Sequence, residues 1–451
     1  MDSDNLSVAS HYKNGASRDY NNGRTMKKNI ARSIAAGLSL ALLAVSASAA
    51  ELPSAAPESL GFSPERLARV GPAIKGEIER GQYPGAVILV ARKGRIVYFE
   101  SFGQLDPASG KPMTKDAIFR LYSMTKPYTS VAAMMLAEEG KLLLTDPVSK
   151  YLPSLTKLQV SVASADPATG AVKYTNVASD RDITIQDLLR HTSGLVYGPF
   201  TANANVKERY AQEGVDWKDV TPAEQVERLS KVPLAHQPGT TFEYSLSTDV
   251  LGRVVEAISG KPLSQFLQER IFTPLGMTDS AFIVPSAKLG RLAQAFATDR
   301  ATKTAINLLD VTVPQKNDAG GAGSVGTAMD YARFLQMMIN GGQLDGVRLL
   351  SPTTVRYMTA DHLGDAKSAG AVAVLPGMGF GLGFAVRREA GLFEVTGSAG
   401  EYFWAGAAGT GFYVDPQEDV ICVWMTQSQP GMARRYDRYL FKQLVYQAIV
   451  E

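Results

Sequence analysis

A serine followed three residues later by a lysine is the clearest candidate for chemistry in this sequence. Ser123 and Lys126 lie in the run Leu-Tyr-Ser-Met-Thr-Lys-Pro at residues 121–127. Residues three apart on a helix share a face, so a helix beginning here would bring the Lys126 amine to the Ser123 hydroxyl. A serine hydroxyl is a weak nucleophile until an adjacent base accepts its proton. The first turn of a helix also presents unpaired N–H groups that can stabilise an oxyanion. The spacing therefore predicts a nucleophilic serine with a lysine partner.

Two segments further along the chain could complete such a site. Tyr244 follows a proline-glycine turn and directly precedes a predicted helix. Residues 404–410, Trp-Ala-Gly-Ala-Ala-Gly-Thr, lead into a late strand, and their small side chains would let the backbone lie close to a ligand. Both segments are therefore candidates for the same site as Ser123 and Lys126.

In this order, the segments make the chain resemble the penicillin-recognising serine hydrolases. These include class C β-lactamases, D-Ala-D-Ala carboxypeptidases and, with the greatest similarity, family VIII carboxylesterases. The resemblance extends over about residues 60–430, and it includes His191-Thr192-Ser193-Gly194-Leu195, Gly320-Gly321-Ala322-Gly323 and Asp330-Tyr331-Ala332-Arg333-Phe334. It implies a β-lactamase/DD-peptidase-like α+β fold and acyl-enzyme chemistry without a cofactor.

The resemblance also implies a role for each catalytic residue. Ser123 attacks a carbonyl carbon and forms the acyl-enzyme, while Tyr244 shares the proton with Lys126 and later returns it to the leaving group or helps to activate water. Which of the two acts as the base is disputed in related enzymes. The N–H groups of Ser123 and Ala407 are expected to form the oxyanion hole, because Ala407 directly follows the third motif.

Two departures from the family pattern bear on the substrate. Relatives that act on β-lactams or peptides generally carry Tyr-x-Asn and Lys-Thr-Gly, where this chain has Tyr244-Ser245-Leu246 and Trp404-Ala405-Gly406. Leu246 and Trp404 would replace an amide and a cation by an apolar wall, against which a substrate carboxylate would lose its partner. A neutral ester has no carboxylate and would lose no such partner. Family VIII esterases usually have Trp-Gly-Gly, so Ala405 replaces one glycine. The expected substrate-binding residues are Tyr122, Leu246, Trp404, Ala405 and Gly406.

The sequence thus predicts a serine hydrolase that cleaves short-chain or aryl carboxylic esters, with a small-molecule ester as its partner. A β-lactamase or D-Ala-D-Ala carboxypeptidase is one alternative. A non-catalytic module that keeps the penicillin-binding fold is another. The sequence leaves the oligomeric state open.

Other chemistries find little support. A Ser-His-Asp hydrolase would need a base among His191, His236 and His362, yet the chain has no Gly-x-Ser-x-Gly elbow. We expect His191 to be structural. Metal chemistry lacks a His-Glu-x-x-His motif, so no metal ligand is predicted. The glycines of residues 379–383 alternate as in a strand and lack the spacing of a nucleotide-binding loop.

The net charge of the chain and the pattern of its first 50 residues indicate where the protein is located and which partners it can bind. Residues 26–50 carry a basic start, an apolar run and an Ala-Ser-Ala sequence, which together predict a secretory signal peptide behind a polar leader of residues 1–25. The net charge of residues 51–451 is −1, because the overall +2 includes three cations within residues 26–50. We therefore expect a periplasmic or secreted protein with no stable membrane insertion and no nucleic-acid partner. The single cysteine, Cys422, lies in an apolar strand-like run and predicts no internal disulfide.

The elements that must position the site follow from hydrophobic periodicity, caps and turns. They are a helix from residue 63 to 78, a hairpin of residues 86–91 and 95–102, helices from residue 123, after the capping box at 184–187, at 250–258 and after residue 327, strands at 379–386, 392–396, 408–414 and 420–426, and a last helix at 436–448. Strands at both chain ends with helices between them predict an α+β fold with one antiparallel sheet. We expect residues 51–451 to form one hydrolase domain, in which 51–122 and 372–451 make the sheet region and 123–371 the mainly helical region.

Overall fold

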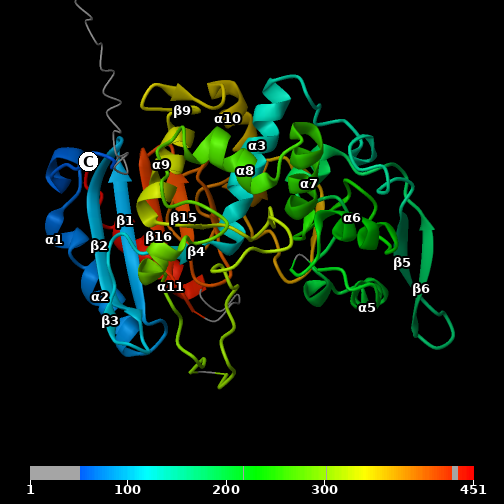
Figure 1. Ribbon diagram of the computed structural model, residues 1–451, viewed down its shortest axis with the longest axis horizontal. Helices are drawn as coiled ribbons and strands as arrows, with labels where there is room; N and C mark the ends of the chain where they lie inside the picture. Colours follow the sequence, from blue (N-terminus) through cyan, green and yellow to red (C-terminus); the bar gives the residue numbers. More distant parts are fainter. Residues whose placement is uncertain (1–50, 217, 301, 429–434) are drawn as a thin grey trace, which may run out of the picture. The chain divides into compact units, whose positions relative to one another are not determined.

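The computed structural model describes residues 51–216, 218–300, 302–428 and 435–451 (Figure 1). The predicted leader and signal peptide, residues 1–50, lie outside the described residues. Within that described part of the chain, no helix is both long and apolar enough to cross a membrane.

An antiparallel sheet of eight strands joins the two ends of the chain, as the sequence predicted. Its strands in spatial order are β12 (Met378–Phe380), β13 (Ala385–Arg387), β14 (Tyr402–Ala405), β15 (Gly411–Asp415), β16 (Val420–Thr426), β1 (Gly85–Arg92), β2 (Arg95–Asp106) and β3 (Lys111–Pro112). The two ends meet where β1 pairs with β16, with Ala86 opposite Thr426. Lys93 and Gly94 both have positive φ angles, 50° and 73°, as a two-residue hairpin turn between β1 and β2 requires.

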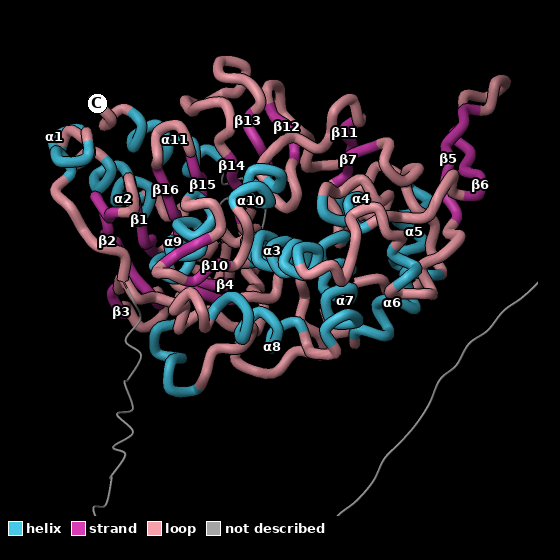
Figure 2. Tube along the Cα trace, turned by 90° about the horizontal axis from the view of Figure 1, so that it is seen from above, coloured by secondary structure: helices cyan, strands magenta, loops and turns pink. Residues whose placement is uncertain are grey.

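Helices cover both faces of this sheet (Figures 1 and 2). On one face, α2 (Val70–Glu79) and α11 (Arg435–Tyr446) pack against side chains such as Ile88 and Trp424. On the other face, α3 (Thr125–Glu138) and α9 (Ala328–Ile339) pack against Val87 and Leu89 in the larger core. Because both faces are covered, β1 is buried along its whole length.

The middle of the chain is mainly helical. Besides α3 and α9 it contains α4 (Ile185–Leu189), α5 (Ala204–Gln212), α6 (Pro222–Ser230), α7 (Ser247–Ser259), α8 (Leu263–Leu267), α10 (Pro352–Met358) and the short pairs β4 (Phe119–Arg120) with β8 (Val325–Gly326), β7 (Thr241–Glu243) with β11 (Lys367–Ala369), and β9 (Gln343–Leu344) with β10 (Val347–Arg348). The predicted capping box before α4 is confirmed, since Thr184 and Asp187 exchange side-chain-to-backbone hydrogen bonds. A hairpin of β5 (Gln159–Ala165) and β6 (Val172–Ala178), largely exposed, projects from this region (Figure 2).

Three predicted elements are wrong in detail. The strand expected at residues 379–386 is divided into β12 and β13, which pair with each other as a hairpin. The helix expected from residue 63 is divided into α1 (Pro64–Leu67), capped by Ser63, and α2, with a turn between them. No strand forms at residues 392–396; β14 takes that place in the sheet. The reason is local packing: Phe393 and Val395 turn into a small cluster with Met378, which removes them from the sheet.

Candidate active site

The start of α3 positions the serine and the lysine. A single 3₁₀ turn, Tyr122–Met124, leads into α3, and Lys126 lies in the first turn of that helix. The Lys126 Nζ lies 3.5 Å from Ser123 Oγ. Tyr122 has a φ of 47°, a left-handed conformation that is unusual for an aromatic residue and marks strain beside Ser123. The Tyr122 hydroxyl accepts a hydrogen bond from the backbone N–H of Leu309 at 2.8 Å, which holds the turn against a distant loop.

Lys126 is buried among neutral oxygens and aromatic rings. Its Nζ lies 2.9 Å from the Gly321 carbonyl oxygen and 3.1 Å from the Tyr197 hydroxyl. The same nitrogen lies over the Tyr244 ring, 4.6 Å from its centroid. The sequence interpretation named neither Tyr197 nor Gly321 as a neighbour of this amine.

A carboxylate reaches the lysine through Tyr197. The Tyr197 hydroxyl donates to Asp249 Oδ2 at 3.5 Å, and Asp249 Oδ1 accepts the Gly321 N–H at 3.0 Å. Asp249 is buried in the first turn of α7, and burial raises its pKa against the opposing effect of the Lys126 charge. Two signals could have indicated these residues: Tyr197 follows the His-Thr-Ser-Gly-Leu motif by two positions, and Asp249 follows Tyr244 by five.

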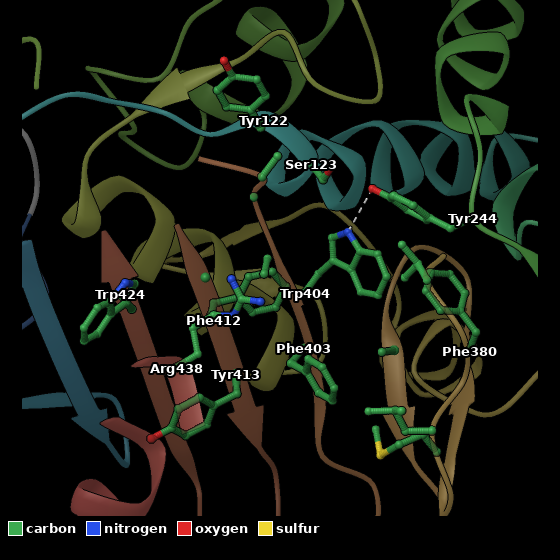
Figure 3. Close-up of a pocket in the computed structure, with 18 of the residues that line it drawn as sticks. Tyr122, Ser123, Tyr244, Phe380, Phe403, Trp404, Phe412, Tyr413, Trp424 and Arg438 are labelled. Carbon is green, nitrogen blue, oxygen red and sulfur yellow. Dashed lines mark hydrogen bonds between the residues drawn. The ribbon is translucent and has the colours of Figure 1, made fainter. Parts of the chain in front are cut away.

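Tyr244 comes to the site from the junction of β7 and α7. In Figure 3 its hydroxyl points toward Ser123 and accepts the hydrogen bond that Trp404 Nε1 donates at 3.4 Å. The Tyr244 ring packs between Trp404 and His191, with centroid distances of 5.1 Å and 4.9 Å. Trp404 therefore fills the space beside the tyrosine, where the sequence interpretation placed its indole.

The third motif lies directly against the residue before the serine. A Cβ atom on Gly406 would lie 2.3 Å from the Leu121 carbonyl oxygen, so only glycine allows this approach. Thr410 Oγ1 donates to the same Leu121 oxygen at 3.2 Å, and the Gly406 N–H donates to the Thr410 carbonyl, closing the turn that contains Ala407. Backbone packing thus brings Ala407 and Ser123 to one site.

A cavity of about 700 Å³ opens at this point, and its lining is mainly aromatic and aliphatic. Of the residues expected from the sequence, it is lined by Tyr122, Ser123, Tyr244, Trp404, Ala405, Gly406 and Ala407. Lys126 lies beneath this wall, 1% exposed. The structure does not bring Leu246 to the cavity: this residue precedes α7, and its buried side chain joins the large core. The prediction that Leu246 binds substrate is therefore wrong.

Comparison with known proteins agrees with this geometry. A model of the Beta-lactamase family matches residues 70–446. The chain belongs to the beta-lactamase family. It is 37% identical over 376 residues to Protein Rv1367c of Mycobacterium tuberculosis (80% of this chain, 90% of the relative). It is 32% identical over 351 residues to Esterase EstB of Burkholderia gladioli (73% and 82%). The solved structure of EstCE1, a hydrolase with promiscuous acyltransferase activity, aligns with a TM-score of 0.69 at 29% identity (85% and 99%). The protein is a serine hydrolase of this family.

The histidines of this beta-lactamase-family chain have other partners. His191 is buried, and its Nδ1 lies 3.1 Å from the Ser245 hydroxyl; burial, with a further contribution from the Lys126 charge, holds its pKa well below the usual range. His236 pairs with Glu243 at 2.6 Å, and His362 contacts the Tyr357 carbonyl at 2.7 Å. Among the described residues, none of the three hydrogen bonds to Ser123, and no cluster of three or more metal-ligating side chains is found.

Proposed function

We propose that this protein is a carboxylesterase in which Ser123 forms the acyl-enzyme and Lys126 and Tyr244 move the protons. The observation that carries the proposal is the placement of the Lys126 amine between Ser123 Oγ, the Gly321 carbonyl and the Tyr197 hydroxyl. A neutral amine has two N–H donors and one lone pair. If Gly321 and Tyr197 accept the two donors, the lone pair is left for the serine proton.

The reaction then has two halves that share the same groups. Ser123 Oγ attacks the ester carbonyl carbon while its proton passes to the Lys126–Tyr244 pair, and the alcohol leaves with a proton from Tyr244. Water that loses a proton to the same pair then attacks the acyl-enzyme, which releases the acid and restores the Ser123 hydroxyl. The Trp404 indole N–H, which donates to the Tyr244 oxygen, would support partial negative charge on that phenol.

We assign the oxyanion hole to the N–H groups of Ser123 and Ala407. Support comes from the close packing of the Gly406 turn on Leu121, which sets both residues on the wall of one cavity. A donor of this kind typically contributes about 2.7–4 kcal/mol to transition-state stabilisation.

The substrate proposed is a neutral short-chain or aryl ester. It rests on the Trp404 indole, which occupies the place where relatives carry a lysine, and on the apolar character of the lining. A β-lactamase or D-Ala-D-Ala carboxypeptidase activity is the second candidate, because the chain is also 28% identical over 421 residues to a protein of Escherichia coli named Putative D-alanyl-D-alanine carboxypeptidase.

One comparison tests the proposal and separates the candidates. Hydrolysis of p-nitrophenyl butyrate and of a chromogenic cephalosporin would be measured for the wild type and Ser123→Ala. We expect ester turnover that the substitution abolishes. Ser130→Ala is the matched control, since this buried serine lies in α3, the helix that follows the turn of Ser123. Cephalosporin turnover far above ester turnover would favour the second candidate, and no turnover of either would favour a non-catalytic module.

We also infer export of a single hydrolase domain, residues 51–451. Support comes from the basic and apolar pattern of residues 26–50. Amino-terminal sequencing of the mature protein from a bacterial periplasm should begin near residue 50, and a mature chain beginning at residue 1 would contradict the inference.

A further inference from the structure

The cavity continues past the third motif to the face of the sheet that α11 covers. On this side it is lined by Phe403, Ala405, Gly411, Tyr413 and Trp424, which we call the inner lobe. Successive strand residues point to opposite faces, so Phe403 and Ala405 face away from the Trp404 indole. Figure 3 shows Phe403, Tyr413 and Trp424 on the far side of Trp404 from Tyr244. The cavity therefore has a second compartment beyond the residues assigned to catalysis.

Gly411 leaves room along this lobe for the side chain of Arg438, which a larger residue would push into the cavity. Its φ is not positive, so no backbone conformation requires a glycine here. A Cβ atom at this position would instead meet the side chains that bound the lobe, 2.9 Å from Arg438 Cδ and 3.7 Å from Ala405 Cβ. A glycine at position 411 is therefore explained by the space that its neighbours occupy and not by backbone conformation. The aliphatic stem of Arg438 passes over Gly411 and adds apolar surface to the wall.

The walls suit an apolar ring and not a charged group. Trp424 is held edge-on by Tyr83, with a centroid distance of 5.5 Å, so it forms a rigid aromatic wall. The charged side chains at the far end already have partners, because Glu401 binds both Lys442 and Arg387, and Arg438 also has an interaction partner. A cavity of about 700 Å³ lies within the ~300–1,000 Å³ range typical of sites for drug-sized ligands. A butyryl group would leave much of it unfilled.

Resting on the function proposed above, we propose that the inner lobe binds a ring-bearing apolar acyl group and that Gly411 determines this specificity. The position of Tyr244 is the reason for assigning the acyl group, and not the alcohol, to the inner lobe. Tyr244 protonates the leaving alcohol, so the alcohol lies on the Tyr244 side of Trp404. The acyl group then extends from the carbonyl at Ala407 to the other side, where the lobe lies.

A pair of esters with one leaving group tests the size preference. The values of kcat/KM for p-nitrophenyl acetate and p-nitrophenyl 4-cyclohexylbutanoate would be compared in the wild type, Gly411→Val and Ser101→Val. A buried methylene contributes roughly fourfold, so we expect the wild type to prefer the ring-bearing ester by at least ~10-fold. Gly411→Val should reduce that ratio by at least ~10-fold. Ser101→Val adds similar bulk to β2, away from the cavity, and should leave the ratio unchanged. An equal ratio in all three proteins would overturn the proposal.

A binding measurement keeps the proposal testable even without turnover. In Ser123→Ala protein, the ring-bearing ester should change tryptophan fluorescence on binding, and Trp424→Phe should reduce that change, leaving the part that Trp404 contributes. Adding Gly411→Val should weaken binding by at least ~10-fold. Unaltered affinity would contradict the lobe assignment, whereas binding without hydrolysis in the wild type would contradict only the proposed esterase activity.

Discussion

Two buried lysines in this molecule have opposite surroundings. Lys126, 1% exposed, contacts a carbonyl, two hydroxyls and a ring face, and meets a carboxylate only through Tyr197. Lys442, 5% exposed, forms a direct ion pair with Glu401, which Arg387 also contacts at 3.1 Å. One amine thus has neutral partners, and the other is bound to a charge.

The difference indicates what each environment is suited to do. Burial lowers the pKa of Lys442, and its attraction to Glu401 opposes that shift, so proton loss would leave Glu401 with one partner fewer. Around Lys126, either protonation state finds hydrogen-bond partners, since hydroxyls both donate and accept. A lysine among neutral oxygens can exchange a proton during a reaction, whereas a lysine in a direct ion pair contributes to stability.

The largest expected effect follows from replacing the first lysine. Lys126→Met should lower kcat/KM for p-nitrophenyl butyrate by ~10³-fold or more, because Ser123 loses its proton acceptor. Stability should change by only about 1 kcal/mol, since the methionine fills the same space and leaves no charge unpaired. Steady-state rates and urea unfolding measure the two effects. Near-normal rates would show that Lys126 is not the proton acceptor of Ser123.

Replacing the second lysine should reverse this pattern. Lys442→Met leaves the buried Glu401 carboxylate with Arg387 alone, so the free energy of unfolding should fall by about 3–4 kcal/mol. The activity should fall much less than in Lys126→Met. Adding Glu401→Gln should recover part of the lost stability in urea unfolding. A double variant less stable than Lys442→Met would show that the carboxylate is not the source of the loss.

Local sequence patterns predicted much of the fold. The Lys93-Gly94 turn and the Thr184 capping box are specified by neighbouring residues, and the β-branched and aromatic residues of β16 favour a strand. The strand predicted at residues 392–396 does not form, because Phe393 and Val395 pack into a cluster with Met378, and β14 instead pairs with β13 and β15. Leu246 was misplaced for a related reason, since the start of α7 decides which way that side chain points.

For the site, the sequence identified residues that short spacing or motif resemblance reveals. Ser123 and Lys126 are one turn apart, and Tyr244 and Trp404 belong to recognisable motifs. The contacts of Lys126 with residues 197 and 321 depend on segments that lie far apart in the chain and meet only in the folded protein. No local pattern encodes such a meeting, which is why the neutral surroundings of the lysine emerged only from the structure.

A third buried ionisable group, Asp330 in α9, tests whether burial produces a pH effect on stability. Asp330 accepts hydrogen bonds from Ser280 Oγ and the Asp279 N–H, and burial raises its pKa to about 6. The folded protein therefore keeps a proton that the unfolded chain releases near pH 4. The contribution of Asp330 to the free energy of unfolding is therefore fully present below about pH 4. It is lost as the pH rises to about 6, by up to about 3 kcal/mol. Unfolding measured from pH 4 to 7 should show this fall in the wild type and not in Asp330→Asn; parallel curves would contradict the assignment.

The smallest predicted effect concerns the link between Lys126 and its carboxylate. Tyr197→Phe keeps the ring that packs on Tyr244 at 5.5 Å and removes only the hydroxyl between Lys126 and Asp249. We expect kcat/KM to fall by roughly tenfold, the equivalent of one hydrogen bond, because the lysine loses a neutral partner. Tyr210→Phe is the matched control: this buried hydroxyl accepts the Val196 N–H at 3.4 Å and has no contact with Lys126. If both variants keep the wild-type kcat/KM, then the Gly321 carbonyl and the Tyr244 ring suffice to hold the amine, and the carboxylate has no part in the chemistry.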